Sequence, residues 1–586
     1  MHQPAHLATI RAHLAAIYAD ARADAAYTRL LALLDTFAQA HPGRAAAARA
    51  ALDQQEIVLI TYGDQVRATG EPPLGTLARL LAGRLHGLAS TVHILPFYPS
   101  SSDDGFAVID YTAVDPQLGS WASDIARLRQ QARLMFDAVV NHISAQSAWF
   151  QAFLRGEPGA ARRFIVHDPA TDLAQVTRPR TSPLLTRFDT PAGPQHIWTT
   201  FSADQIDLNY ADPTLLAEMV GVLLRYVAEG ASLIRLDAIG YLWKEPGTSC
   251  IHLPQTHRVV QLFRSVLDAV APDVLLVTET NVPHRDNISY FGNGTNEAQM
   301  VYQFPLAPLV LHAFATGDAE PLSAWAAGLA PPSPQTSFFN FLASHDGIGV
   351  VPASGMLSRA QIAGLAARAE AHGGYVSYKT NPDGSQSPYE LNITLFDALT
   401  HPDEQHTDPA RAVARFLAAN AIMLALQGVP GIYIHSLLGS SNDHAGVAAT
   451  GRARSINRAR WQLADLERRL DDRSNRASIV LAGFSAMLGV RRTRPAFHPS
   501  GPQRVLAGDP GVLTLLRSDP AGQRHMLCAH NVSAQPRALQ LSAAALPELA
   551  GRALFDALSG RAILAAWPGD ATITLAPYQV LWLEHQ

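Results

Sequence analysis

The sequence predicts an α/β fold: a (β/α)8 TIM barrel with small domains inserted in its loops, an N-terminal helical extension and a C-terminal antiparallel β domain. From Glu56 onward, short apolar runs rich in β-branched residues alternate with helical stretches. Eight such runs occur, as a closed barrel requires, and the 586 residues leave room for inserts. A doubly wound open sheet is the alternative, but its Gly-rich phosphate turn is not seen after the first strand.

Residues 1–55 precede the alternating region and are rich in Ala, Leu, Arg and Asp. Apolar residues such as Leu30, Leu34 and Phe37 recur at helical spacing, which predicts two or three helices packed on the main body. A frayed, Ala-rich extension is the alternative.

The predicted barrel covers residues 56–496. Buried parallel strands have nearly continuous apolar sequences, and this property identifies the runs. The predicted strands are Glu56–Asp64, Ser90–Pro99, Ala132–His142, Ala231–Tyr241, Asp273–Asn281, Glu297–Phe304, Thr336–Asp346 and Gly428–Leu438. The stretches Leu74–Leu85, Leu215–Glu229 and His257–Val270 are among the predicted helices between them.

Two connections are too long for simple loops. Residues 144–210 are rich in Pro, Thr and Arg, and residues 347–408 contain Gly-Gly, Asn-Pro-Asp-Gly and Ser-Pro turn signals. Both inserts are expected to shape the pocket. Residues 497–586 form the predicted β domain, with strands at Gly511–Ser518, Gln523–Val532 and Ala571–Trp582.

Composition excludes several function classes. The formal charge is −5, from 50 acidic and 45 basic residues, without a long basic block, so neither nucleic-acid nor membrane-surface binding is expected. Apolar stretches such as Ala421–Leu426 are far too short to cross a membrane, and no secretory apolar region begins the chain. Cys250 and Cys528 lack disulfide-framework or zinc spacing. A cytoplasmic protein without a metal or cofactor is expected.

Three acids each end one of these apolar runs: Asp237, Glu279 and Asp346. In a barrel they would meet at the C-terminal rim. Two carboxyl groups flanking a glycosidic bond suffice for glycosyl transfer, one attacking the anomeric carbon and the other protonating the leaving oxygen. Asp237, kept ionised by Arg235 on the same strand face, is the expected nucleophile. Glu279, in an apolar setting that raises its pKa, is the expected acid/base.

Two other interpretations of these acids are open. Strand-end acids often cap loops or helix N-termini. A metal site is also conceivable, but the spacing of its candidate ligands does not support it; they are Asp137, Asn141, His142, Asp237 and Glu279.

Four strings resemble the signature regions of the α-amylase family of retaining glycosidases, in the family's order. They are Asp137–His142, Ile234–Ala238, Thr278–Thr280 and Ser344–Asp346. The resemblance implies a transition-state stabiliser at Asp346. It also implies that His142, Arg235 and His345 bind the glucosyl unit.

A narrower resemblance is to the sucrose phosphorylase subfamily, carried by strings such as Asp104-Gly105-Phe106 and Ile456-Asn457-Arg458. It implies that Asp103, Phe106 and Arg458 hold the non-reducing glucose, with Asp103 and Arg458 paired to close the pocket. The Arg178-Pro179-Arg180 string matches the place of a phosphate-contacting Arg, which points to Arg180.

The string Thr278–His284, the acceptor loop Tyr378–Gly384 and the N-terminal extension resemble the glucosylglycerate phosphorylase branch instead. That branch uses phosphate to cleave 2-O-α-glucosyl-D-glycerate, giving glucose 1-phosphate. A basic loop suits its anionic aglycone. The predicted acceptor- and phosphate-binding residues are Arg180, Tyr241, Lys379, Tyr389 and Glu390.

The expected partners are therefore a small sugar substrate and inorganic phosphate, with the chain a monomer or homodimer. Sucrose, sucrose 6-phosphate and glucosylglycerol remain alternative substrates. An α-glucosidase, a transglucosylase and a non-catalytic amylase-like subunit are more distant alternatives.

Overall fold

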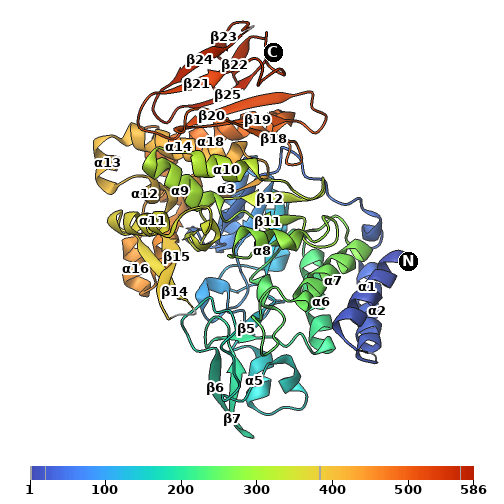
Figure 1. The fold of residues 1–586 in the computed structure, drawn as a ribbon. Helices are drawn as coiled ribbons and strands as arrows, with labels where there is room; N and C mark the ends of the chain where they lie inside the picture. Colours follow the sequence, from blue (N-terminus) through green and yellow to red (C-terminus); the bar gives the residue numbers. More distant parts are fainter. Residues whose placement is uncertain (1–2, 20, 382–383, 568, 586) are drawn as a thin grey trace.

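A computed structural model describes residues 3–19, 21–381, 384–567 and 569–585 of the chain. Its centre is a closed barrel of parallel strands, which confirms the predicted fold class (Figure 1). Around the barrel the strands follow one another in chain order. They are β1 Val58–Thr61, β3 Thr91–Ile94, β4 Arg133–Ala138, β9 Ala231–Leu236, β10 Leu275–Thr278, β11 Met300–Tyr302, β12 Ser337–Asn340 and β16 Val429–Tyr433.

All eight predicted runs contain a barrel strand, but each strand is shorter than its run. The residues after a strand stay buried while the chain leaves the sheet, so hydrophobicity alone overestimates strand length. Asp237 and Glu279 are the first residues after β9 and β10. Because β9 and β10 pair in parallel, with Leu236 beside Thr278, the two acids leave the barrel at the same level.

Helices surround the barrel strands. Helix α6 begins at Pro213, where Asp212 accepts hydrogen bonds from the backbone N–H groups of Thr214 and Leu215. Such an N-cap stabilises a helix by about 1 kcal/mol. The main outer helices are α3 Pro73–Ala82, α6 Pro213–Ala228, α7 Pro254–Val270, α9 Leu306–Thr316, α10 Glu320–Ala327, α14 Pro409–Ala425, α17 Leu463–Asp471 and α18 Arg476–Thr493.

Among the described residues, the first fifty contain two α-helices, α1 Pro4–Ile17 and α2 Ala21–Ala40, and the short 3-10 helix η1 Arg44–Ala46. They lie beside α7 and α6 (Figure 1). Ile10, Leu14 and Leu34 are fully buried in the main core. The Tyr18 hydroxyl donates a hydrogen bond of 2.7 Å to the carbonyl of Tyr210.

Both long connections contain secondary structure. The first holds β5 His142–Ser144, α5 Ala148–Leu154, β6 Leu185–Thr190, β7 Gly193–Trp198 and β8 Gln205–Asp207. The second holds β13 Ile348–Gly349, α11 Arg359–Ala371, β14 Tyr375–Thr380, β15 Gln386–Asn392, α12 Leu395–Leu399 and α13 Pro402–Thr407. Strands β13, β15 and β14 form a small sheet, while Pro382 and Asp383 of the predicted acceptor loop lie outside the described residues.

The C-terminal part is antiparallel, with an additional apolar core of its own. One sheet contains β18 Gln503–Leu506, β19 Val512–Ser518, β20 His525–Asn531, β22 Leu554–Asp556, β23 Ala562–Leu564 and β25 Val580–Glu584. A second pairs β21 Arg537–Leu541 with β24 Ala571–Leu575. The single strand predicted over 571–582 is wrong, because a turn with Tyr578 at φ 57° divides it between the two sheets.

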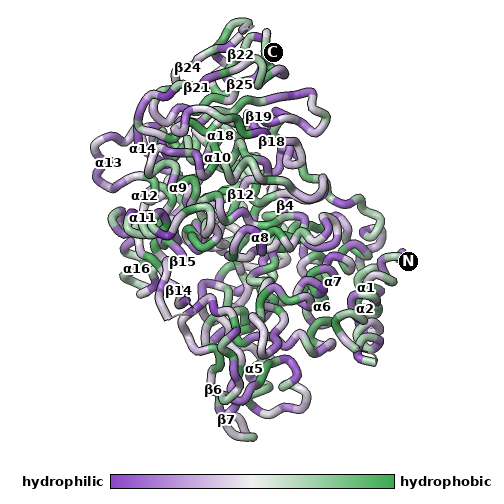
Figure 2. Tube along the Cα trace, viewed as in Figure 1, coloured by the Kyte–Doolittle hydropathy of each residue, from purple (hydrophilic) through white to green (hydrophobic). Residues whose placement is uncertain are grey.

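Hydropathy follows this arrangement, with hydrophobic segments concentrated around the barrel strands and mixed colouring along the outer helices (Figure 2). No helix among the described residues has the length and apolar character needed to span a bilayer.

Candidate active site

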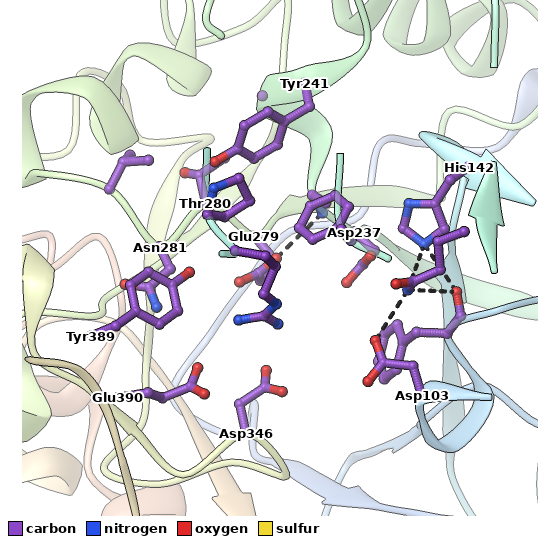
Figure 3. Close-up of a pocket in the computed structure, with 18 of the residues that line it drawn as sticks. Asp103, His142, Asp237, Tyr241, Glu279, Thr280, Asn281, Asp346, Tyr389 and Glu390 are labelled. Carbon is purple, nitrogen blue, oxygen red and sulfur yellow. Dashed lines mark hydrogen bonds between the residues drawn. The ribbon is translucent and has the colours of Figure 1, made fainter. Parts of the chain in front are cut away.

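A cavity opens at the carboxyl ends of the barrel strands, and all three predicted acids line it (Figure 3). Loops after seven of the barrel strands contribute side chains, and two of these loops carry the inserts, so residues far apart in the chain meet here. The lining includes Asp103, Phe106, His142, Arg180, Gln205, Asp237, Tyr241, Glu279, Asn281, His345, Asp346, Tyr389, Glu390 and Arg454.

Asp237 is contacted by Arg235, as expected from strand alternation: Nη1 lies 2.9 Å from Asp237 Oδ1. The same nitrogen also binds Asp137, which accepts a 2.8 Å hydrogen bond from His93. Burial raises the pKa of Asp237 well above its usual value; Arg235 opposes this, and Glu279 and Asp137 add to it. Arg235 favours the ionised form of Asp237, as expected, but its guanidinium is shared among several carboxylates and does not offset burial.

Glu279 lies near the other side of the same guanidinium, with Oε2 3.6 Å from Nη2 of Arg235. The backbone N–H of Ala238 donates a 3.3 Å hydrogen bond to the same oxygen. Burial raises the pKa of Glu279, against the opposing effect of Arg235, in the direction predicted. Because Asp237 and Glu279 interact, their protons titrate as a pair, and a single proton can reside on Glu279 while Asp237 is ionised.

Asp346 differs from Asp237 and Glu279 because its pKa is lowered and not raised. It lies in a turn after β12, 3.0 Å from Nη1 of Arg454 and 3.7 Å from Nη2 of Arg458. Burial would raise the pKa of Asp346, but its surroundings outweigh burial and hold the pKa well below its usual value. Burial lowers the pKa of His345, 3.4 Å away, to about 3, so this imidazole is neutral near pH 7 and the arginines supply the positive charge.

Asp103, Phe106 and His142 also line the cavity, and Figure 3 shows Asp103 and His142 on the side away from Tyr389 and Asn281. His142 Nε2 lies 2.9 Å from the carbonyl of Phe106, and the Phe106 ring stacks on His345 with centroids 5.0 Å apart. Gln205 Nε2 donates a 3.0 Å hydrogen bond to Asp103.

The expected Asp103–Arg458 pair is not formed. Arg458 binds the neighbouring Asp104 through Nη1 and donates a 2.8 Å hydrogen bond to the carbonyl of His345. Both aspartates have left-handed backbone conformations, with φ 52° at Asp103 and 49° at Asp104. This geometry turns Asp103 toward the cavity and Asp104 toward Arg458, an assignment that sequence spacing cannot make. Such strained conformations concentrate at functional sites.

Four of the five predicted acceptor-side residues line the cavity, namely Arg180, Tyr241, Tyr389 and Glu390. The Arg180 guanidinium lies over the Tyr389 ring, 5.8 Å from its centre. Lys379 is not brought to this site: its half-buried side chain lines a different hollow with Arg359 and Pro388. On the β14–β15 hairpin it pairs with Ser387, away from Tyr389 and Glu390.

Comparison with known proteins identifies the relatives of this chain. A model of the catalytic domain of α-amylases matches residues 85–346. The chain is 53% identical over 530 residues to the glucosylglycerate phosphorylase of Allomeiothermus silvanus, covering 90% of this chain and 91% of the relative. The chain belongs to the glucosylglycerate phosphorylase group of the α-amylase family.

More relatives agree with this membership. The glucosylglycerate phosphorylase of Escherichia coli is 46% identical over 533 residues, covering 91% of this chain and 92% of the relative. A sucrose phosphorylase of Agrobacterium vitis is 32% identical over 486 residues, covering 79% and 92%. The crystal structure of sucrose 6F-phosphate phosphorylase from Thermoanaerobacter thermosaccharolyticum has the same fold, with a TM-score of 0.71 at 24% identity over 84% of this chain and 96% of that one.

Arg454 and Gln205 are two of the polar residues in this cavity that the sequence did not predict. Arg454 joins Asp346 to Glu390, whose Oε2 lies 2.7 Å from its Nη2. Its only sequence signal is its position four residues before Arg458. Gln205 joins Asp103 to His142, but a lone Gln in an insert carries no recognisable pattern. Among the described residues, no group of three or more His, Cys, Asp or Glu side chains is placed to hold a metal ion.

Proposed function

We propose that this chain is a retaining phosphorylase that cleaves 2-O-α-D-glucosyl-D-glycerate with inorganic phosphate to α-D-glucose 1-phosphate and D-glycerate. The observation that carries the proposal is the joint contact of Asp237 and Glu279 with Arg235, at the rim of a barrel closely related to glucosylglycerate phosphorylases. One cation between two carboxylates suits a nucleophile and a proton donor on the same glycosidic bond.

In the first step, a carboxylate oxygen of Asp237 attacks the anomeric carbon while the bond to the glycerate oxygen breaks. The Glu279 carboxyl gives its proton to that departing oxygen. The raised pKa of Glu279 suits this role, because a carboxyl group must hold its proton near neutral pH to act as an acid. The product is a β-glucosyl ester of Asp237, and D-glycerate leaves.

In the second step, a phosphate oxygen attacks the same carbon from the face that glycerate left, and the ester bond to Asp237 breaks. Two inversions give net retention, hence α-glucose 1-phosphate. Glu279, now a carboxylate, takes up any proton carried by the attacking phosphate oxygen. Water in place of phosphate would give glucose, so the outcome depends on what occupies the acceptor side.

Asp346 is proposed as the transition-state stabiliser. Its low pKa keeps it anionic beside the positive charge that develops on the sugar ring. The remaining glucosyl-binding residues proposed are Asp103, Phe106, His142, Arg235, His345 and Arg458. Arg458 acts indirectly. It binds Asp104 and the carbonyl of His345, and these contacts hold the loops that close the cavity to longer sugar chains.

The acceptor-side arginines differ in how their charge is used. Arg454 is paired with Asp346 and Glu390, whereas Arg180 has no ion pair with any residue that the structure describes. An arginine without a carboxylate partner is suited to a phosphate or a glycerate carboxylate. Arg180 is therefore the proposed anion-binding residue.

The test is to incubate the purified chain with glucosylglycerate, with and without phosphate, and to measure glucose 1-phosphate and glucose. Phosphate-dependent glucose 1-phosphate is expected; equal glucose release without phosphate would identify a hydrolase. The chain is then incubated with glucose 1-phosphate and either glycerate, glycerol, fructose or fructose 6-phosphate. The compound that causes phosphate release is the acceptor. The monomer or homodimer state and the cytoplasmic location remain predictions.

A further inference from the structure

A side chain on the acceptor side of the cavity is left without a partner. Asn281, two residues after Glu279, lines the cavity, and its Oδ1 is buried without a hydrogen bond. Its Nδ2 likewise has no hydrogen bond to any residue that the structure describes. Buried carboxamides are nearly always hydrogen-bonded, and leaving one unpaired is unfavourable, so a carboxamide with neither end bonded requires a physical reason.

The position of the Asn281 carboxamide depends on Gly349. A Cβ atom at residue 349 would lie 2.9 Å from Nδ2 and 3.0 Å from Oδ1 of Asn281, so the glycine leaves the room that this side chain occupies. Gly349 belongs to β13 and pairs with Glu390 of β15. The carboxamide thus lies against the small sheet that carries the acceptor-side residues, and Figure 3 shows it beside Tyr389 and across the cavity from His142.

A carboxamide offers one acceptor and two donors. When the 2-oxygen of glycerate lies at Glu279, the aglycone has two polar groups left, a carboxylate and a 3-hydroxyl. The carboxylate accepts from Nδ2, and the hydroxyl donates to Oδ1. Glycerol offers only hydroxyl groups, lactate lacks the 3-hydroxyl, and phosphate offers several oxygens but no carbon skeleton.

We propose that Asn281 is a specificity-determining residue whose carboxamide binds the carboxylate and the 3-hydroxyl of glycerate. The proposal rests on the function proposed above and adds the residue that distinguishes this aglycone from its neutral analogue. The charge of Arg180 attracts any anion. The Asn281 carboxamide instead offers one donor and one acceptor, which match the carboxylate and the 3-hydroxyl of a 2,3-dihydroxy acid.

The test uses the full chain in the synthetic direction, with glucose 1-phosphate and either D-glycerate, glycerol or lactate, following phosphate release. For Asn281→Ala, kcat/KM for glycerate should fall about 10- to 100-fold, as expected for losing one charged and one neutral hydrogen bond. The ratio of kcat/KM for glycerate to kcat/KM for glycerol should fall as well, because glycerol has no carboxylate contact to lose. Asn293→Ala, in an exposed turn, is the matched control and should leave all rates unchanged.

Asn281→Asp separates the two contacts. It keeps Oδ1 but replaces the donor with an anion, so glycerate and lactate activity should fall further than in Asn281→Ala, while glycerol activity changes less than about threefold. Gly349→Ala leaves Asn281 in the chain but displaces it, and should reproduce the loss of glycerate selectivity. These two variants decide the matter if Asn281→Ala does not fold.

Glycerate kinetics within twofold of the parent in Asn281→Ala, or an equal loss for glycerate and glycerol in Asn281→Asp, would overturn the proposal. Failure of the proposed function has a different signature. The parent chain would then release no phosphate in response to glycerate, whatever residue 281 is.

Discussion

At the scale of single residues, one guanidinium organises the reaction centre. Arg235 contacts Asp137, Asp237 and Glu279, so its charge is divided among three carboxylates in a buried site. Burial raises the pKa values of both Asp237 and Glu279, and the divided charge of Arg235 does not offset it. Asp346 is close to Arg454 and Arg458 and stays ionised.

Replacing Asp237 with Asn should abolish phosphorolysis, with a fall in kcat of about 10⁴-fold or more, because no other group can form the covalent ester. Phosphate release from glucose 1-phosphate, measured without acceptor, should fall equally, since both reactions need the ester. Unchanged thermal unfolding would show that the loss is chemical. Residual activity within tenfold of the parent would exclude Asp237 as the nucleophile.

The pH profile of kcat/KM for glucosylglycerate should be bell-shaped. Activity rises as the coupled pair loses its first proton and Asp237 becomes ionised, and it falls as the second proton leaves Glu279. Since burial raises both pKa values, both limbs should lie above the pH near 4 at which ordinary carboxyls titrate. Glu279→Gln should remove the alkaline limb and lower kcat about 10²- to 10⁴-fold. An alkaline limb that persists in this variant would assign it to another group.

At the scale of elements, the β14–β15 hairpin presents different residues to two hollows. Tyr389 and Glu390 face the catalytic cavity, while Lys379 faces the second hollow.

Arg180 lies in the catalytic cavity with Tyr389, so Arg180→Ala should raise KM for glycerate at least about tenfold, since a charge-assisted hydrogen bond is lost. Lys379→Ala should change it less than twofold, contrary to the expectation from loop composition. Titrating glycerate at saturating glucose 1-phosphate gives KM for both variants. A larger rise in KM for Lys379→Ala than for Arg180→Ala would place the anion at Lys379.

The barrel strands were predictable because burial on both faces gives each strand an apolar run, and the acids at the ends of these runs could be located for the same reason. The conformations of the loops could not be predicted. Which of Asp103 and Asp104 meets Arg458 depends on two left-handed φ angles, and the contacts of Arg454 depend on where its loop passes β15. No residue-type pattern encodes these conformations, so the glucosyl half of the site was more predictable than the acceptor half.

At the scale of the whole molecule, α1 and α2 extend the hydrophobic core over α6 and α7, so the extension should contribute directly to global stability. Leu14 and Leu34 are fully buried, and truncating either to Ala should lower the free energy of unfolding by about 2–5 kcal/mol through lost burial and cavity formation.

The matched control is the ion pair between Arg11 and Asp24, whose side chains are 64% and 67% exposed, at 2.9 Å. Arg11→Ala should cost less than about 1 kcal/mol, because solvent screens an exposed pair. Chemical denaturation of the two Leu variants and this control measures the difference in their free energies of unfolding. Hydrolysis of glucose 1-phosphate without acceptor measures whether the active site still works. The acid trio lies at the barrel rim, and no hydrogen bond or ion pair among the described residues joins it to these helices, so kcat should be retained at temperatures where the variants are folded. If Leu34→Ala instead lowered kcat with no loss of stability, the extension would be acting on the active site and not on the core.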